Sequence, residues 1–520
     1  MKTKKLVALL LTAAMATSAM SVTAFAAGGE DSTESLKIVE KPGDLSASGS
    51  RIGTPWYNRS VANNLMFRAL FIATNSDLTE VKEDLADSYE VSDDGLTYTI
   101  TLKDGLSWSD GEALTVDDVQ WSIETALKAA KVNSIYTAAF ATIDSIETDG
   151  NTITLKLASP YSTMLDVLAQ FAILPKHCLE DADPLTMEAD DYWKSPVTCG
   201  MFVLDELSTG NYYTLKYNDK YEGTEPKIKN VTCYYVNDYV TAAQDGKVDF
   251  ILESDPSLEE ALSGMDNFTS YAINSLFYKY LIFNMKGTDG NENEAMQNVE
   301  VRKALIEAID RATLATLYPN ATVLNSGVPN DNEAYNGFEY TFDAEKAKAD
   351  LEASGYDMSR TLKICYYNND QTSVDLINTI VYYLEQTGLT VEATLSNDGT
   401  TDLFTTRDYD IGFKGKGAFS INEWYTEYMS TDGLFANIFG GDTDFDEPIT
   451  KLTGATSADE TKAALEDLEA LEQEKVYKVP LFTVGTYAFS SDRITIPEGV
   501  EFCNPLYMKD IDFVDWEINE

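Results

Sequence analysis

The sequence predicts an α/β protein built from more than one domain, and three observations lead to this fold class. The chain has 520 residues, which is more than a single hydrophobic core usually serves. Residues 362–366 and 389–395 have strand patterns, and the amphipathic residues 374–388 between them indicate a helix, so together they predict a βαβ unit with parallel strands. Residues 85–124 predict a β-hairpin that is followed by a capped helix.

Residues 85–124 carry the clearest local signals in the chain. From residue 97 to residue 102, apolar side chains alternate with threonines, which places the two kinds on opposite faces of a strand. The Asp-Gly pairs at 94–95, 104–105 and 110–111 predict tight turns, because Asp tolerates left-handed backbone and Gly has no Cβ to clash there. Thr115 then offers a hydroxyl as the N-cap of the helix.

Strand and helix patterns alternate through the rest of the chain. A second hairpin is predicted at residues 143–157, with its turn at Asp149-Gly150-Asn151. Helical patterns occur at 61–70, 299–311, 342–355 and 457–474, and further strand patterns at 36–39, 234–236, 280–284 and 408–411.

The first residues have the pattern of a secretory signal peptide. A basic tip precedes an apolar run that ends at Ala24-Phe25-Ala26, a small-x-small cleavage site, so we expect residues 1–26 to be removed. No later stretch reaches the roughly 18 apolar residues of a membrane span. The first cysteine is Cys178, so no lipid attachment is expected at the cleavage site. The protein is therefore expected to be extracytoplasmic, either periplasmic or secreted and associated with the cell surface.

The charge of the chain is strongly negative. It has 86 acidic and 38 basic side chains, for a net charge of −48. Such a field repels nucleic acids and anionic lipid surfaces, so neither is an expected partner. Because 44% of the residues are apolar, the chain can still bury large cores, and we interpret most of the acidic residues as a solvated surface.

The residues offer little for enzyme chemistry. His177 is the single histidine, no G-x-S-x-G elbow occurs, and we expect the side chains of His177 and its neighbour Cys178 to diverge, so no nucleophile–base pair is predicted. The five cysteines are widely spaced, and their odd number leaves at least one unpaired. A Cys178–Cys199 or a Cys199–Cys233 disulfide stays open.

Neither a metal nor a cofactor is expected. One histidine with scattered cysteines does not make a zinc cluster, and no Walker or dinucleotide fingerprint occurs. Acidic residues crowd at 442–447, but no glycine stands at the sixth position of a calcium loop, so a solvated acidic loop is the better interpretation. Paired carboxylates of a hydrolase stay possible, because 86 acids bring some together by chance.

Several segments together resemble a known family. The string LADSYEVSDDGLTYTITLKDGLSWSDGEALTVDDVQWS resembles the signature segment of the family 5 extracytoplasmic solute-binding proteins, the oligopeptide and dipeptide receptors of ABC importers. Further likenesses are ILPKH at 173–177, VEVRKALIEAIDR at 299–311, FDAEKAKADLEASG at 342–355 and VPLF at 479–482. The resemblance covers nearly the whole mature chain.

The resemblance implies a two-lobed periplasmic-binding-protein type II fold of the cluster C type, with an extra small α+β domain. After the signal peptide, it implies that residues 27–75, 166–268 and 485–520 form lobe I. Residues 76–165 would then form the small domain, and residues 269–484 would form lobe II.

The ligand is then expected in a cleft between the lobes, where aromatic walls and a few polar groups would hold it. Peptide-binding relatives tend to carry an Asp a few residues after G-W, which pairs with the amino terminus of the peptide. Here Phe413 stands about where the Trp is usual, two lysines follow, and the nearest following acid is Glu423. This departure puts the usual amine anchor in doubt, and Lys414 or Lys416 could instead favour a carboxylate or another anion. The predicted ligand-binding residues are Trp56, Tyr57, Asn58, Arg59, Tyr278, Tyr366, Phe413, Lys414, Lys416, Phe419, Glu423, Trp424 and Tyr487.

We therefore expect a solute receptor of an ABC importer, one that captures an oligopeptide, closes over it and delivers it to the permease without chemistry of its own. The first alternative is the same fold for a non-peptide solute, such as an oligosaccharide or an organic anion. A secreted hydrolase that uses carboxylates, and a binding module for sensing or scavenging, are further alternatives. The expected partners are the small-molecule or peptide ligand and the ABC permease subunits, and the protein is expected to be a monomer.

Overall fold

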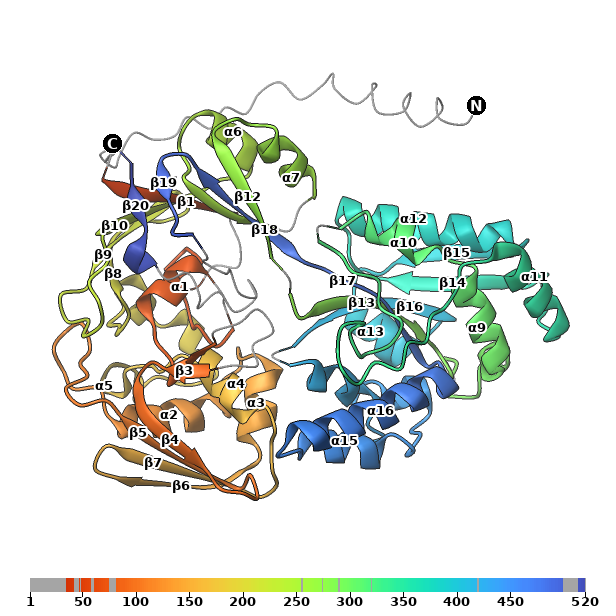
Figure 1. The fold of residues 1–520 in the computed structure, drawn as a ribbon, viewed down its shortest axis with the longest axis horizontal. Coiled ribbons are helices and arrows are strands. Elements are labelled where there is room, and N and C mark those ends of the chain that lie inside the picture. Colours follow the sequence, from red (N-terminus) through yellow and green to blue (C-terminus); the bar gives the residue numbers. More distant parts are fainter. Residues whose placement is uncertain are drawn as a thin grey trace.

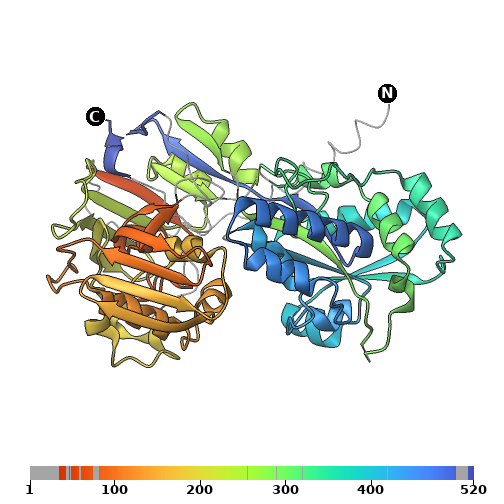
Figure 2. The ribbon, with the colours of Figure 1, turned by 60° about the horizontal axis from the view of Figure 1, so that its bottom comes forward.

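The computed structural model has two α/β lobes that are joined in the middle, with a smaller sheet attached to the first lobe (Figures 1 and 2). The expected signal peptide lies outside the described residues, as do Asn58, Arg59, Phe419 and Cys503. The structure describes residues 34–41, 46, 48–57, 60–73, 81–253, 256–273, 275–288, 290–318, 320–418, 420–498 and 513–519.

A mixed seven-stranded sheet forms the first lobe. The central strand runs parallel to both of its neighbours, and all six of its residues are buried, as expected of a strand covered on both faces. The helices α6 (Tyr239–Gln244) and α7 (Pro256–Ser263) pack against this sheet through a shared apolar cluster. In order across the sheet, the strands are β12 (Phe268–Ile273), β18 (Thr486–Ser491), β11 (Phe250–Glu253), β1 (Ser35–Glu40), β10 (Asn230–Tyr235), β9 (Tyr212–Tyr217) and β8 (Phe202–Ser208).

Both predicted hairpins are present and together form a four-stranded antiparallel sheet, which lies below the first lobe in Figure 1. In residues 97–102 the apolar side chains are buried and the threonines are partly exposed, as the alternation predicted. In order across the sheet, the strands are β4 (Ala86–Val91), β5 (Thr97–Leu102), β7 (Thr152–Leu157) and β6 (Ile143–Asp149).

The turns and the capped helix of residues 85–124 are also as predicted. Gly95, Gly105 and Gly111 all have positive φ, which the tight Asp-Gly turns require. The helix α2 (Val116–Ala126) begins after Thr115, whose backbone N–H donates to the carboxylate of Asp118 at 2.9 Å.

A five-stranded sheet forms the second lobe. The helix α12 (Gln371–Gln386) connects two neighbouring parallel strands of this sheet, which confirms the predicted βαβ unit. In the view of Figure 1, α12 lies above the sheet, while α15 (Asp446–Thr453) and α16 (Ala458–Lys475) lie below it. In order across the sheet, the strands are β15 (Thr390–Leu395), β14 (Thr361–Tyr366), β16 (Ile411–Gly417), β13 (Phe277–Phe283) and β17 (Lys478–Thr483).

Two of the predicted helices are shorter than their patterns. The predicted helix 299–311 is wrong as a single element, because α9 (Val299–Glu307) ends early and α10 (Arg311–Ala315) follows. The carboxylate of Asp310 accepts the backbone N–H of Thr313 at 3.2 Å and so caps a new helix. The predicted helix 61–70 ends with α1 (Val61–Met66), since the backbone becomes extended at the next residue.

The chain crosses between the lobes where β12 leads into β13 and where β17 leads into β18. The two crossings approach each other closely. A Cβ atom on Gly485 would lie only 2.6 Å from the backbone oxygen of Ile273, so no larger residue fits between the crossings without movement. The two connections thus form the narrow join that is seen between the lobes in Figure 1. The residue boundaries of the lobes and of the small domain stay a prediction.

The cysteines and the acidic segment 442–447 were both left open by the sequence, and the acidic segment is not simply a solvated loop, because its last two residues belong to α15. Cys178 and Cys233 are free thiols, so neither of the two disulfides that the sequence left open forms. In the acidic segment 442–447, Asp442 and Asp444 both pair with the ammonium group of Lys475, at 3.2 and 2.5 Å. These carboxylates are therefore occupied by protein groups. Among the described residues, no helix is both long and apolar enough to cross a membrane.

Candidate functional site

A cavity of about 1310 Å³ lies between the two lobes. On one side its walls come from the four-stranded sheet and from the segment that leads into α4 (Met164–Gln170). On the other side they come from the start of the 3-10 helix η5 (Ile421–Tyr428) and from the loop and first turns of α16. Because the two walls belong to different lobes, a change in the angle between the lobes would open or close the cavity.

The two lobes touch directly at one edge of this cavity. The backbone N–H of Ser162 donates to the carbonyl oxygen of Thr453 at 2.7 Å, and its hydroxyl donates to that of Leu452 at 3.2 Å. The side-chain amide of Asn422 donates to the Ser162 hydroxyl at 3.4 Å. These polar contacts hold the lobes together around the cavity in the structure.

Two carboxylates lie close enough at this interface for their charges to interact. Asp166, on α4 of the first wall, lines the cavity, and Glu423, on η5 of the second wall, is buried beside it. Burial raises the pKa of Asp166 well above its usual range, and the negative charge of Glu423 raises it further. Two like charges in a poorly solvated place repel each other, so a cation placed between them would be favourable.

Two tyrosines accompany the carboxylates. The hydroxyl of Tyr98 donates to the backbone oxygen of Tyr161 at 3.3 Å. Burial and the charge of Asp166 raise the pKa of Tyr98 to about 12, and burial and the charge of Glu423 raise that of Tyr161. Both phenols therefore keep their protons at neutral pH. The proton of Tyr98 is already donated to the backbone of Tyr161, so Tyr161 is the phenol that can donate to a ligand, while the oxygen of Tyr98 can accept.

Behind η5, a buried ionic cluster holds the wall of the second lobe together. Glu427 accepts the hydroxyl of Tyr280 at 2.8 and 3.0 Å from its two oxygens. The ammonium groups of Lys414 and Lys478 each lie 3.2 Å from this carboxylate, and that of Lys416 lies 3.9 Å away. Despite its burial, the three lysines lower the pKa of Glu427.

The most deeply buried of these lysines is Lys478. Its ammonium donates to the Tyr278 hydroxyl at 2.7 Å and to the backbone oxygen of Trp424 at 2.8 Å. Burial lowers the pKa of Lys478 to about 8, although the charge of Glu427 acts in the opposite direction. One carboxylate shared among three ammonium groups does not fully compensate the burial of Lys478.

The structure packs most of the predicted aromatic residues into the cores behind the cleft. The ring centroids of Tyr278 and Trp424 lie 4.4 Å apart, and the indole N–H of Trp56 donates to the backbone oxygen of Ala172 at 2.8 Å. These side chains have almost no surface open to a ligand. The buried residues of the predicted set are Trp56, Tyr278, Tyr366, Phe413, Glu423 and Trp424.

The other described residues of the predicted set are partly open to solvent. Tyr57 is 50% exposed, with the ammonium of Lys131 5.4 Å from its ring centroid, and Tyr487 lies half-buried on β18. Lys414 and Lys416 are half-buried and bound to the Glu427 cluster, so their charges are already partly neutralised. Among the described residues, none of the predicted set lines the cavity directly, and Glu423 comes nearest because residues 420–422 do.

Sequence reasoning missed Asp166 and Tyr161. Both lie where the chain returns from the second hairpin, Tyr161 in the connection after residue 157 and Asp166 in the first turn of α4. The available signal was a run of polar residues between a strand and a helix. It missed Lys478 too, although a lysine inside an otherwise apolar strand is unusual and needs a buried partner.

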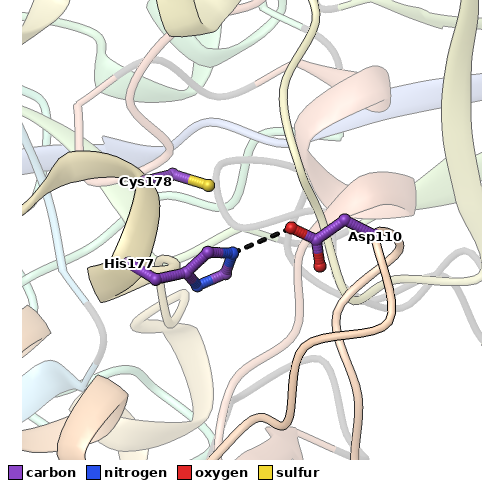
Figure 3. A group of neighbouring side chains, drawn as sticks. All are labelled: Asp110, His177 and Cys178. Carbon is purple, nitrogen blue, oxygen red and sulfur yellow. Dashed lines mark hydrogen bonds and ion pairs between the residues drawn. The ribbon is translucent and has the colours of Figure 1, made fainter.

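The structure also brings together three residues that the sequence analysis kept apart. The donor atoms of Asp110, His177 and Cys178 all lie within 4.8 Å of one another (Figure 3). The expectation that His177 and Cys178 diverge was wrong, because both lie on the short helix α5 (Lys176–Leu179) and bend toward one turn. Burial and the charges of Asp110 and Asp118 raise the pKa of Cys178 to about 11, so this thiol is not an activated nucleophile.

Two lobes joined by two crossings, with a large cavity between them, are the architecture of a solute-binding protein. The chain belongs to the bacterial extracellular solute-binding proteins, family 5, because the model of the middle part of this family matches residues 80–446. This membership confirms the resemblance, and it confirms the expectation of a binding protein rather than an enzyme. The proteins of this family are extracellular by the family's description.

Individual relatives agree with the family. A Brucella ovis protein assigned by its name to the ABC transporter peptide-binding proteins is 28% identical over 330 residues, which cover 60% of this chain and 60% of that protein. The chain thus matches about three fifths of the length of this relative.

Solved structures confirm the expected type II fold. The substrate-binding protein CtaP of Listeria monocytogenes has a TM-score of 0.79 and 22% identity, and the match covers 94% of this chain and 99% of that one. The oligopeptide-binding protein AppA of Bacillus subtilis, solved with a nonapeptide, has a TM-score of 0.72 and 18% identity, with the same coverage of 94% and 99%.

Proposed function

We propose that this protein is the receptor of an ABC importer for oligopeptides, which it binds in the cavity between its lobes. The observation that carries the proposal is the cavity of about 1310 Å³. Clefts for drug-sized ligands measure about 300–1,000 Å³, so this cavity is large enough for a chain of several amino acids. The peptide-binding names of the relatives support the same ligand class.

Asp166 and Glu423 are the proposed anchor for the amino terminus of the peptide. An ammonium group between them would neutralise a repulsion that burial makes costly, and it would form charge-assisted hydrogen bonds. The pair takes the place of the Asp that peptide-binding relatives carry after G-W and that is missing after Phe413. The phenols of Tyr98 and Tyr161 would position the first residue of the peptide.

Organic anions have less support as ligands. Lys414 and Lys416, which the sequence suggested as anion-binding groups, are held by Glu427. Of the two carboxylates, Asp166 lines the cavity and Glu423 is buried beside it, while Lys82 and Lys462 are the lysines among the described lining residues. Oligosaccharides have no particular observation in their favour.

Delivery to a permease, removal of residues 1–26 as a signal peptide, and a monomeric state complete the proposal. After removal of the signal peptide the receptor would be free in a periplasm or held at the cell surface by a partner. The sensing or scavenging role would differ from this one only in lacking the permease.

Native mass spectrometry of the protein purified from its host tests the ligand class. We expect a co-purifying mass that tandem fragmentation identifies as a peptide of several residues with a free amino terminus. A thermal-shift comparison should then show that such peptides raise the Tm, and that at equal concentration tighter-binding peptides raise it more. Stabilisation by sugars or organic anions, with no peptide effective, would contradict the proposal.

A further inference from the structure

A group of metal-ligating side chains lies on the surface of the first lobe, and its members are not among the residues that line the cavity. Nε2 of His177 lies 2.9 Å from Oδ2 of Asp110, and Sγ of Cys178 points toward the same carboxylate (Figure 3). All three donor atoms lie within 4.8 Å of one another, and all three residues are exposed.

We propose that Asp110, His177 and Cys178 form a binding site for a divalent cation of the Zn²⁺ class, with water as a fourth ligand. The three donors are a carboxylate oxygen, an imidazole nitrogen and a sulfur atom, which is the ligand set that Zn²⁺ and its neighbours prefer. Ca²⁺ and Mg²⁺ prefer oxygen ligands alone, so they do not fit this set. The proposal is independent of the receptor function.

The distances need only small side-chain movements. The bonds from Zn²⁺ to its ligands are about 2.0–2.3 Å long, so the donors around one ion lie roughly 3–4 Å apart. Asp110 and His177 are already at such a separation. Because the side chains are exposed, a rotation of Cys178 toward the other two meets little resistance.

The backbone on the Asp110 side of the site is fixed. Asp110 lies in a turn in which the N–H of Gly111 donates to the carbonyl oxygen of Trp108 at 2.9 Å. The N–H of Ser109 donates to the carbonyl oxygen of Thr198 at 2.8 Å, which ties the turn to the first lobe. The donor on this side is therefore held in place before a cation arrives.

The backbone on the α5 side is fixed as well. The N–H of Lys176 donates to Oδ1 of Asp118, on α2, at 3.0 Å, and the N–H of Cys178 donates to the carbonyl oxygen of Pro175 at 3.1 Å. The ring centroid of the buried Trp108 lies 6.3 Å from that of His177, so the two rings are neighbours. A bound cation would link α5 to the turn that contains Asp110, two segments that are far apart in the sequence.

Binding exchanges protons for metal bonds. The hydrogen bond between His177 and Asp110 is replaced by one bond from each residue to the cation, with the imidazole neutral. The thiol of Cys178 gives its proton to solvent and binds as the thiolate. About one proton should therefore be released for each cation bound.

The test uses the full mature chain after treatment with a chelator. We expect calorimetry with ZnCl₂ to show one strong site, and Co²⁺ as the probe to give the near-ultraviolet absorption of a thiolate–metal bond. Saturating Zn²⁺ should slow the alkylation of Cys178 by iodoacetamide at least tenfold. This last measurement uses the unaltered protein, so it does not depend on the folding of any variant.

Three variants locate the site. Cys178→Ser should abolish the thiolate–Co²⁺ absorption, and Cys178→Ser and His177→Gln should each weaken Zn²⁺ binding at least tenfold. Glu180→Gln, which removes a neighbouring exposed carboxylate that is not a proposed ligand, should bind like the unaltered protein. Equal Zn²⁺ affinity in Cys178→Ser and the unaltered protein, or alkylation that Zn²⁺ does not slow, would overturn the proposal.

Discussion

The most consequential residue of the proposed site is Asp166. Its carboxylate lines the cavity in a poorly solvated place and faces the charge of Glu423 from the other lobe. Such an arrangement costs stability when both groups are ionised, and a ligand ammonium recovers that cost. The repulsion that destabilises the empty site is relieved when the ligand binds, so the relieved free energy contributes to binding. Functional sites often carry such a cost in stability.

Asp166→Asn should therefore stabilise the ligand-free protein at neutral pH and weaken the binding of a peptide amine. The raised pKa means that the folded protein holds a proton which the unfolded chain releases, so this residue lowers stability as the pH rises above about 4. The variant should lose this dependence and show a higher Tm at pH 7. Its affinity for a free-amine peptide should fall about 10- to 100-fold, the usual loss for one charge-assisted hydrogen bond.

Asp144→Asn is the matched control for this change, because Asp144 is exposed on β6 and is not among the residues that line the cavity. It should leave both the Tm and the affinity unchanged. A lower Tm in Asp166→Asn at pH 7 would contradict the repulsion on which the proposed anchor rests.

The lowered pKa of Lys478 predicts a second dependence of folding stability on pH, opposite in sign to that of Asp166. Its pKa of about 8 means that the folded protein binds fewer protons than the unfolded chain between about pH 8 and 10.5. Stability should therefore rise with pH through this window, by an amount on the order of 3 kcal/mol. Denaturant unfolding of Lys478→Met should lack this rise relative to the unaltered protein. Lys128→Met, which replaces an exposed lysine just after α2, controls for the loss of a charge. If Lys478→Met showed the same dependence of stability on pH as the unaltered protein, the account would be contradicted.

At the scale of elements, the two crossings between the lobes would carry any motion that accompanies ligand binding. They pass so closely that Gly485 has room for no side chain beside Ile273. Hinges of this kind absorb backbone rotation over a few residues at the ends of strands. The sheets on either side can then move as rigid bodies.

Gly485→Ala should strain this join. The added Cβ would meet the backbone oxygen of Ile273 at 2.6 Å, and overpacking of this kind costs roughly 1–3 kcal/mol. Thermal unfolding should show the loss as a lower Tm, and ligand affinity should fall because the closed angle is harder to reach. Gly433→Ala, where the added Cβ meets nothing within 4 Å, should change neither quantity; equal behaviour of the two variants would contradict a tight hinge.

Local patterns predicted the elements well where each signal was confined to a few residues. The Asp-Gly turns, both hairpins and the βαβ unit were predicted from periodicity and turn chemistry. The break in the helix 299–311 was missed, since Asp310 is an ordinary polar residue until its carboxylate caps the next helix.

Most of the candidate site could not be predicted, because it depends on contacts between distant segments. Asp166 and Glu423 are far apart in the sequence and meet only when the lobes come together. Aromatic residues predicted for the cleft, such as Phe413 and Trp424, are in the core behind it, since an apolar side chain serves a core and a binding wall equally well. Lys414 was predicted to bind the ligand because the sequence does not show that Glu427 pairs with it in the folded protein.

At the scale of the whole molecule, the structure has the lobes in contact at Ser162. If closure accompanies binding, the ligand-free protein in solution should be more open than this structure, and the ligand-bound protein should match it. Small-angle X-ray scattering should therefore show a smaller radius of gyration with a saturating peptide than without it. Identical scattering with and without ligand would mean that the lobes do not move on binding.

The central claim is that a peptide binds between the lobes with its amino terminus at Asp166 and Glu423. Titration calorimetry of one peptide that co-purifies with the protein, measured with a free and with an acetylated amino terminus, tests this claim most directly. The account predicts that acetylation weakens binding about 10- to 100-fold in the unaltered protein and has little effect in Asp166→Asn. Equal affinity of the two peptides for the unaltered protein would contradict it.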